Sequence, residues 1–400
     1  MGATRTVKVV ALVVGLVVTV VWAGTGWNII REGVEGGIEK ATDAPFYSVP
    51  TTVPAAAPGT LYRSAPIPSA PAGTRAWRVI YHSTDVLGHD ILVSGSVIVP
   101  LGAAPTGGRT IVSWGHPTTG AVARCAPSIG FAPFDLIEGM NGLLKQGYVV
   151  AATDYPGMGV AQPDSYLIGA SEGNSVLDAA RVARTLTKAS DRLLLWGHSQ
   201  GGHAALFAAQ SAKSYAPELH LLGVAVAAPA TDLGVLLDDD ITGLSGVTIA
   251  SYAFQAYSQV YGARLDSILT PAGVAATPTM SNLCLLGQNA RIHAIARPLV
   301  GGYLASDPAK TEPWASLLAA NTPGAVKLDV PLLVNQGAAD KLVIPTATDE
   351  FVAHECAIGS TVSYYTYDNT THGTIAYRAM PRVLDWFAGL ERGENTLPHC

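Results

Sequence analysis

Residues 193–214, near the middle of the chain, restrict the possible folds more than any other stretch. Residues 193–196 read Leu-Leu-Leu-Trp, an apolar run typical of a strand buried on both faces. This run passes through Gly197-His198-Ser199-Gln200-Gly201-Gly202 into an alanine-rich helical pattern over 203–214. A Gly-x-Ser-x-Gly sequence between strand and helix makes a sharp turn that presents the serine, and side chains at the glycines would clash. The stretch therefore predicts a strand–turn–helix unit with Ser199 as a candidate nucleophile.

A second match to the same pattern occurs at Gly169-Ala170-Ser171-Glu172-Gly173. The preceding residues, 164–168, are short and poorly suited to a strand, and the following ones open a long amphipathic helix. We interpret Ser171 as the N-cap of that helix, because serine is favoured at this position.

Beyond residue 76, short β-type runs alternate with helical patterns. The expected strands are 77–83, 91–99, 110–114, 148–153, 193–196, 221–227, 331–335 and 362–367, and the expected helices include 172–187, 203–214 and 347–356. The first two runs follow each other without a helix, and alternation begins later. This order predicts an α/β fold with a mixed, mostly parallel sheet and helices on both sides.

One long interval, from residue 233 to 330, contains no convincing strand. It carries helical segments at 249–262, 283–296 and 314–320, separated by proline and glycine. So long a connection within an α/β domain is usually an insertion such as a lid or cap. We therefore expect a core over 76–233 and 326–400, with a helical lid inserted at 234–325.

The amino end predicts export. Arg5 and Lys8 precede an uninterrupted apolar run over 9–23, which suits a signal peptide ending near residue 26. A retained signal anchor remains open, because no charge follows until Arg31. In either case the rest of the chain is outside the cell, free or held at the outer face of the membrane. Residues 27–75 read as an extended arm rich in proline and alanine.

Charge and cysteine content narrow the class further. Charged residues make up 14% of the 400 residues and the net charge is −6. The low charge excludes a disordered chain, and no basic stripe suggests a nucleic-acid partner. Four cysteines, Cys125, Cys284, Cys356 and Cys400, lack metal-binding spacing and are compatible with two disulfides in any of three connectivities.

A nucleophilic serine needs a base and an orienting carboxylate, and in hydrolases of this architecture the chain order is Ser, acid, His. The expected strand at 331–335 is followed by Asp340, and the one at 362–367 by His372. The carboxyl ends of parallel strands share one edge of the sheet. We therefore predict that Asp340 is the acid and that His372, on a loop at the same edge, is the base.

The oxyanion of a tetrahedral intermediate needs two pre-placed N–H donors. The backbone of Gln200, directly after the nucleophile, supplies one. The other is expected from the loop Gly115-His116-Pro117-Thr118-Thr119-Gly120, and the spacing does not separate Thr118 from Thr119.

No motif indicates a cofactor or a metal: the chain has no phosphate-binding loop, dinucleotide fingerprint or HExxH. Asp238-Asp239-Asp240 resembles a calcium-binding cluster, but we interpret it as a solvated loop of the lid.

Several separate segments carry a resemblance to a known family. They are Asp43-Ala44-Pro45-Phe46-Tyr47, Cys125-Ala126-Pro127-Ser128, Asp154-Tyr155-Pro156-Gly157-Met158-Gly159, 197–202, Ser214-Tyr215-Ala216-Pro217-Glu218-Leu219 and Thr371-His372-Gly373. Spread over 43–390, they resemble the secretory lipases of the α/β-hydrolase superfamily. The loop at 116–119 departs from the acidic loop of the yeast members.

The resemblance implies an α/β-hydrolase fold, a catalytic triad of Ser199, Asp340 and His372, and a lid over about 234–325. It also implies the disulfides Cys125–Cys284 and Cys356–Cys400.

The predicted function is a secreted or membrane-anchored serine ester hydrolase, a triacylglycerol lipase or carboxylesterase acting through an acyl-enzyme. Its partner would be an acyl ester or lipid substrate, with contact to a membrane or lipid interface through the lid. The alternatives are an acyltransferase or esterase acting on cell-envelope lipids, and a non-catalytic binding protein of the same fold. The sequence does not predict the length of the acyl chain.

Overall fold

The computed structural model describes residues 45–129, 133–394 and 399–400. The predicted signal peptide or anchor, residues 1–26, and the start of the predicted arm lie outside these ranges. Among the described residues, the helices are too short or too polar to cross a membrane.

Nine strands of the described residues form one sheet, in the order β1-β2-β3-β5-β4-β6-β7-β8-β9. They are β1 (Leu61–Pro66), β2 (Thr74–Thr84), β3 (Asp90–Pro100), β4 (Ile111–Gly115), β5 (Val149–Thr153), β6 (Arg192–His198), β7 (His220–Ala227), β8 (Leu332–Gly337) and β9 (Val362–Tyr367). The pairs from β1 through β3 to β5 are antiparallel, and all pairs from β5 through β4 to β9 are parallel. The predicted mixed, mostly parallel sheet is confirmed.

The edge strand β1 lies in the segment that the sequence assigned to an extended arm. It pairs antiparallel with β2 and is only partly buried. A half-exposed edge strand that ends at a proline, here Pro66, has no continuous apolar run by which it could be recognised.

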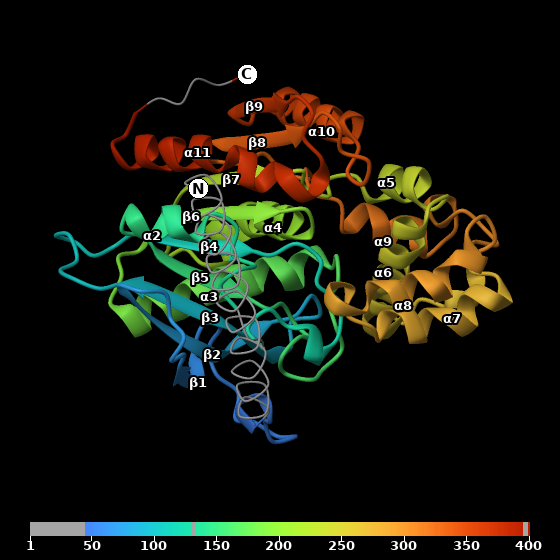
Figure 1. Cartoon of the computed structure of the whole chain (residues 1–400), viewed down its shortest axis with the longest axis horizontal. Helices are drawn as coiled ribbons and strands as arrows, with labels where there is room; N and C mark the ends of the chain where they lie inside the picture. The colour runs from blue at the N-terminus through green and yellow to red at the C-terminus, as the bar shows by residue number, and fades with distance from the viewer. Residues whose placement is uncertain (1–44, 130–132, 395–398) are drawn as a thin grey trace, which may run out of the picture.

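Helices cover both faces of the sheet (Figure 1). They are α2 (Met140–Lys145), α3 (Gly169–Thr187), α4 (Gln200–Tyr215), α10 (Pro345–Ala357) and α11 (His372–Glu391). In β6, Leu193 and Leu195 belong to the core shared with α3, α4 and α10, whereas Leu194 and Trp196 belong to the core shared with α2 and α11. This burial on both faces explains the continuous apolar run of β6.

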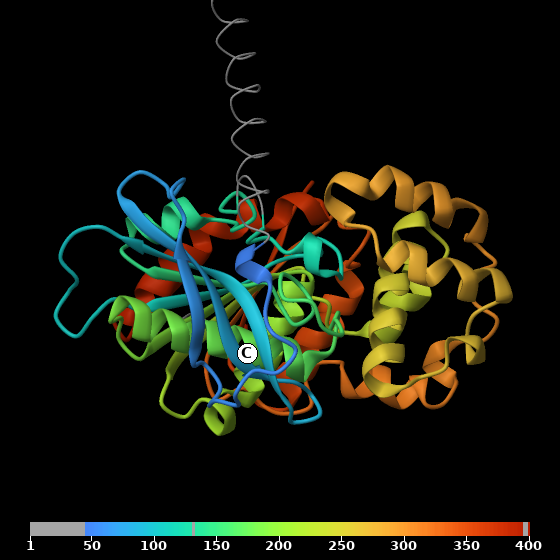
Figure 2. The ribbon, with the colours of Figure 1, turned by 90° about the horizontal axis from the view of Figure 1, so that it is seen from below.

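A group of helices, which we call the inserted helices, connects β7 to β8. They are α5 (Leu233–Asp240), α6 (Leu244–Tyr261), α7 (Pro271–Ser281), α8 (Leu285–Ala296) and α9 (Trp314–Ala320). Figures 1 and 2 show them gathered at one end of the molecule, in yellow and orange, beside the sheet.

Two disulfides join distant parts of the chain. Cys125, after β4, pairs with Cys284 just before α8, and Cys356 in α10 pairs with Cys400. These are the pairs that the family resemblance implies. The first ties the inserted helices to the core, and the second ties the carboxyl end to α10.

Candidate active site

Ser199 lies on the sharp turn between β6 and α4. Its backbone has φ 58° and ψ −120°, a strained conformation for a residue with a side chain. A Cβ added to Gly197 would collide with the carbonyl oxygen of Gly201, and one added to Gly201 with that of Gly115. The glycines are therefore required because three backbone segments meet at this turn.

Ser199, His372 and Asp340 form a continuous line of hydrogen bonds. His372 Nε2 is 2.9 Å from Ser199 Oγ, and His372 Nδ1 is 2.8 Å from Asp340 Oδ2. Ser199 is 8% exposed and Asp340 is 4% exposed. The structure thus brings together the three residues that the sequence proposed as nucleophile, base and acid, although they are far apart in the chain.

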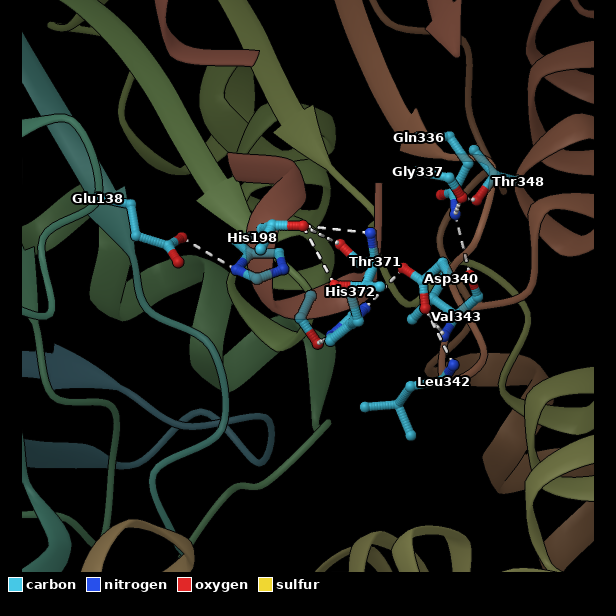
Figure 3. A network of polar contacts seen from close by, with 12 residues as sticks. Glu138, His198, Gln336, Gly337, Asp340, Leu342, Val343, Thr348, Thr371 and His372 are labelled. Carbon is cyan, nitrogen blue, oxygen red and sulfur yellow. Dashed lines mark hydrogen bonds and ion pairs between the residues drawn. The ribbon is translucent and has the colours of Figure 1, made fainter. Parts of the chain in front are cut away.

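The carboxylate of Asp340 is held in place by the loop that follows β8. Its Oδ1 accepts the backbone N–H groups of Leu342 at 2.9 Å and Val343 at 3.0 Å, which leaves Oδ2 for His372 (Figure 3). Hydrogen bonds to an ionised carboxylate are strong, so this loop fixes the acceptor that orients the imidazole.

His372 is the first residue of helix α11, whereas the sequence placed it on a loop. Thr371 is the N-cap, and Thr371 and Thr374 form a capping box. Threonine in place of the usual Glu or Gln at the third helical position weakened this start signal in the sequence. The capped first turn gives the imidazole a more rigid support than a loop would.

The two threonines considered as oxyanion donors have different surroundings. Thr118 lines the same cavity as Ser199 and Gln200, and its hydroxyl is 2.6 Å from that of Tyr166. Thr119 is buried, and its hydroxyl donates to the carbonyl of Cys125. The structure therefore brings Thr118, rather than Thr119, to the wall of the cavity.

Glu138 and His198 form a buried pair that the sequence analysis missed. Glu138 Oε2 is 2.9 Å from His198 Nδ1, and the ring of His198 lies 4.9 Å from that of His372 (Figure 3). The pair joins residues 60 positions apart, and no local pattern marks Glu138 as a partner of the turn. His372 is thus flanked by His198 on one side and by Asp340 on the other.

The cavity beside Ser199 is walled mainly by apolar side chains of the inserted helices. They include Leu233, Leu236, Leu237, Ile249, Ala250, Ala253, Phe254, Leu285 and Leu318. A wall of this kind suits an acyl chain, because apolar surface leaves water when the chain binds.

Asp240 supplies the only carboxylate among the described residues that line this cavity. Burial, together with the charges of Asp239 and Asp340, raises the pKa of Asp240 to about 7. The interpretation of 238–240 as a solvated loop is wrong for Asp240, because the three residues end α5 and only Asp238 and Asp239 are exposed. The described residues contain no group of three or more His, Cys, Asp or Glu side chains placed to bind a metal ion.

Ser171, in the second Gly-x-Ser-x-Gly match, is not an N-cap. Helix α3 begins at Gly169, and the hydroxyl of Ser171 accepts the backbone N–H of Val86 at 2.9 Å. Ser171 therefore fixes a neighbouring loop, and the next residue, Glu172, is completely buried beside the turn that carries Ser199.

Comparison with known proteins identifies relatives. The family model described as secretory lipase matches residues 136–397. Lipase 5 of Candida albicans is 30% identical over 217 residues, which cover 48% of this chain and 45% of that protein, so this match spans about half of either. A protein of Mycobacterium tuberculosis named probable inactive lipase MT1628 is 24% identical over 384 residues, covering 90% of this chain and 84% of that one.

Two groups of solved structures share the fold. Candida antarctica lipase A in its closed state superposes with a TM-score of 0.76 at 20% identity, covering 89% of this chain and 87% of that one. The rice cell wall degrading esterase LipA from Xanthomonas oryzae superposes with a TM-score of 0.71 at 21% identity, covering 85% and 100%. The predicted α/β-hydrolase fold is thereby confirmed.

Proposed function

Because this chain belongs to the secretory lipase family, we propose that it is an exported serine hydrolase that cleaves acyl esters through Ser199, His372 and Asp340. The observation that carries the proposal is the line of hydrogen bonds from Asp340 through His372 to Ser199, which ends at an apolar cavity. Nucleophile, base and orienting carboxylate are thus already within reach of one another.

The first half of the reaction forms an acyl-enzyme. Ser199 Oγ attacks the ester carbonyl while His372 Nε2 takes the hydroxyl proton, and Asp340 stabilises the imidazolium. The tetrahedral intermediate collapses as His372 gives this proton to the departing alcohol. The second half repeats the steps with water as the nucleophile, which releases the carboxylic acid and restores Ser199.

The negative oxygen of each tetrahedral intermediate needs backbone donors. We assign them to the N–H of Gln200, at the first position of α4, and to the N–H of Thr118. The first N–H groups of a helix have no acceptor within it, and the helix dipole favours negative charge there. The place of Thr118 in the cavity wall supports this choice over Thr119.

We propose that the inserted helices act as a lid that supplies the acyl-binding wall and contacts a lipid surface. Leu286 in α8, and Val300 in the connection between α8 and α9, are apolar side chains that are 52% and 38% exposed. Hydrolysis of long-chain esters should then rise when vesicles or micelles are added, whereas hydrolysis of a soluble acetate ester should not.

The test of the activity is hydrolysis of p-nitrophenyl esters from acetate to palmitate by the wild type and by Ser199→Ala. Turnover by the wild type that Ser199→Ala loses supports the triad. Full activity in Ser199→Ala, at an equal folded fraction, would overturn it.

A non-catalytic binding protein is the second candidate, because one relative that matches most of the chain is named a probable inactive lipase. It predicts no turnover across the whole ester series, even though the wild type is folded. The acyltransferase alternative predicts that added alcohols compete with water and yield new esters. Product analysis with and without alcohol separates these outcomes.

A further inference from the structure

A fully buried carboxylate, that of Glu172 in α3, lies directly behind the turn that carries Ser199. Its Oε1 accepts hydrogen bonds from Gln200 Nε2 at 2.7 Å and from the backbone N–H of Leu167 at 3.0 Å. Its Oε2 is 3.2 Å from His203 Nδ1. Glu172 and His203 are both 0% exposed, and Gln200 is 2% exposed.

Glu172 therefore binds two residues of the first turn of α4, one at its first and one at its fourth position. Burying a carboxyl group is costly unless polar partners satisfy it, and here two side chains of α4 and one backbone N–H before α3 do so. Both ring nitrogens of His203 face oxygens, Nδ1 that of Glu172 and Nε2 the backbone carbonyl of Asn321.

The far side of this network is also anchored. His203 Nε2 is 2.7 Å from the carbonyl oxygen of Asn321, the residue that follows α9. The side chain of Asn321 accepts the N–H of Gly169 at 2.9 Å and donates to the hydroxyl of Tyr261 at 3.1 Å. The first turn of α4 is thus held between α3 and the inserted helices.

Such support matters because the turn is strained. The positive φ of Ser199 is unfavourable for a residue with a side chain and persists only where the surroundings fix it. The N–H of Gln200, proposed above as an oxyanion donor, belongs to the residue whose side chain Glu172 holds. Catalytic donors must be held to about half an ångström, and the residues behind them provide that precision.

We propose that Glu172, with His203, is a positioning residue that holds the Gln200 N–H in the geometry of the oxyanion. The proposal rests on the proposed function and deepens it. Glu172 does not line the cavity, so its loss should impair stabilisation of the transition state and leave binding of the ground state intact.

Asp178 provides a matched control on the same helix. It is 0% exposed, and it also joins α3 to α4, because it accepts from the hydroxyl of Tyr215 at 2.8 Å and from Arg181 at 2.7 Å. Tyr215 is the last residue of α4, so Asp178 holds the end of the helix remote from Ser199. Glu172→Gln and Asp178→Asn therefore each replace a fully buried carboxyl group by an amide, at opposite ends of α4.

The test measures ester hydrolysis by the wild type and both variants, with active sites counted by a fluorophosphonate. For Glu172→Gln we expect kcat to fall about 10–100-fold, KM to change less than about twofold, and affinity for a trifluoromethyl ketone transition-state analogue to fall with kcat. For Asp178→Asn we expect a lower melting temperature but nearly the wild-type kcat per active site.

A second variant covers the case in which Glu172→Gln folds poorly. Gln200→Met removes the hydrogen bond between Gln200 and Glu172 from the Gln200 side, keeps the backbone N–H of residue 200, and should lower kcat to a similar extent. The double variant Glu172→Gln/Gln200→Met should have a kcat no lower than that of the less active single variant. Equal kcat losses in Glu172→Gln and Asp178→Asn, or additive losses in the double variant, would overturn this inference alone. Absence of turnover in the wild type would overturn the proposed function itself.

Discussion

Asp240 should make the proposed hydrolysis of long-chain esters depend on pH near neutrality. Its carboxyl lies in a mainly apolar cavity wall, and burial raises its pKa from 3.8 to about 7. The raised value means that the charged form is disfavoured, so the group is mostly neutral below pH 7 and mostly charged above it. An acyl chain that covers Asp240 removes more water from it and binds the neutral form better.

The size of the effect follows from proton linkage. With a pKa of about 7, half of the Asp240 carboxyls are neutral at pH 7, roughly a tenth at pH 8 and roughly a hundredth at pH 9. If a long chain bound only the neutral form, kcat/KM would therefore fall about 100-fold by pH 9. Asp240 is only half-buried, so part of its charge stays solvated and about 3–30-fold is expected.

The assay compares kcat/KM for a long-chain p-nitrophenyl ester between the wild type and Asp240→Asn from pH 6 to pH 9. The ratio of the wild-type value to the Asp240→Asn value cancels every pH dependence that the two proteins share, and it should fall as pH rises through 7. Asp238→Asn is the matched control, because Asp238 is exposed on the same helix, does not line the cavity and, unlike Asp239, is not one of the charges that raise the pKa of Asp240. A ratio that stays constant over this range, or an equal effect in Asp238→Asn, would refute the reasoning.

Three further outcomes are expected. Asp340→Asn should lower kcat by roughly 10³–10⁴ while the protein stays folded, because the imidazole loses the carboxylate that orients it, and steady-state kinetics with active-site titration checks this. Replacing Cys125 and Cys284 by serine should lower the free energy of unfolding by up to about 5 kcal/mol on loop-entropy grounds. The loss should exceed that of the same change at Cys356 and Cys400, because the joined cysteines are 159 rather than 44 residues apart. Denaturant unfolding of the two variants measures the order, and the reverse order would contradict the prediction. Burial raises the pKa of Asp164 to about 7, so its ionisation destabilises the folded state as pH rises from about 4 to 7. The gain in unfolding free energy of Asp164→Asn over the wild type should therefore be larger at pH 8 than at pH 5. Urea unfolding at the two pH values checks this, and an equal gain at both would contradict it.

The sequence predicted the parts of the fold that local patterns encode. The strands buried on both faces are continuous apolar runs, and the observed bounds of β6, Arg192–His198, extend the expected 193–196 by only a few residues. Edge strand β1 lacked such a run, and α11 lacked a strong start signal, so neither was predicted. Both depend on contacts with the rest of the sheet.

The candidate site, like the fold, was predicted from the sequence only in part. Ser199, Asp340 and His372 follow predicted strands at one edge of a sheet, so their meeting could be expected from topology alone. Glu172 and Glu138 bind Gln200 and His198 across 28 and 60 residues, and only the folded structure brings them together. A short glycine-rich motif therefore predicts a candidate nucleophile but not the groups that hold it.

The inserted helices contact the surroundings of both proposed oxyanion donors. On one side, the backbone N–H of Leu285 donates to the carbonyl of Thr119 at 2.9 Å, beside the Cys125–Cys284 disulfide. On the other side, Asn321 accepts from His203, which is joined through Glu172 to Gln200. Since the same contacts fix the position of the helices and the two donor segments, a substitution among the inserted helices can change kcat without touching Ser199, His372 or Asp340.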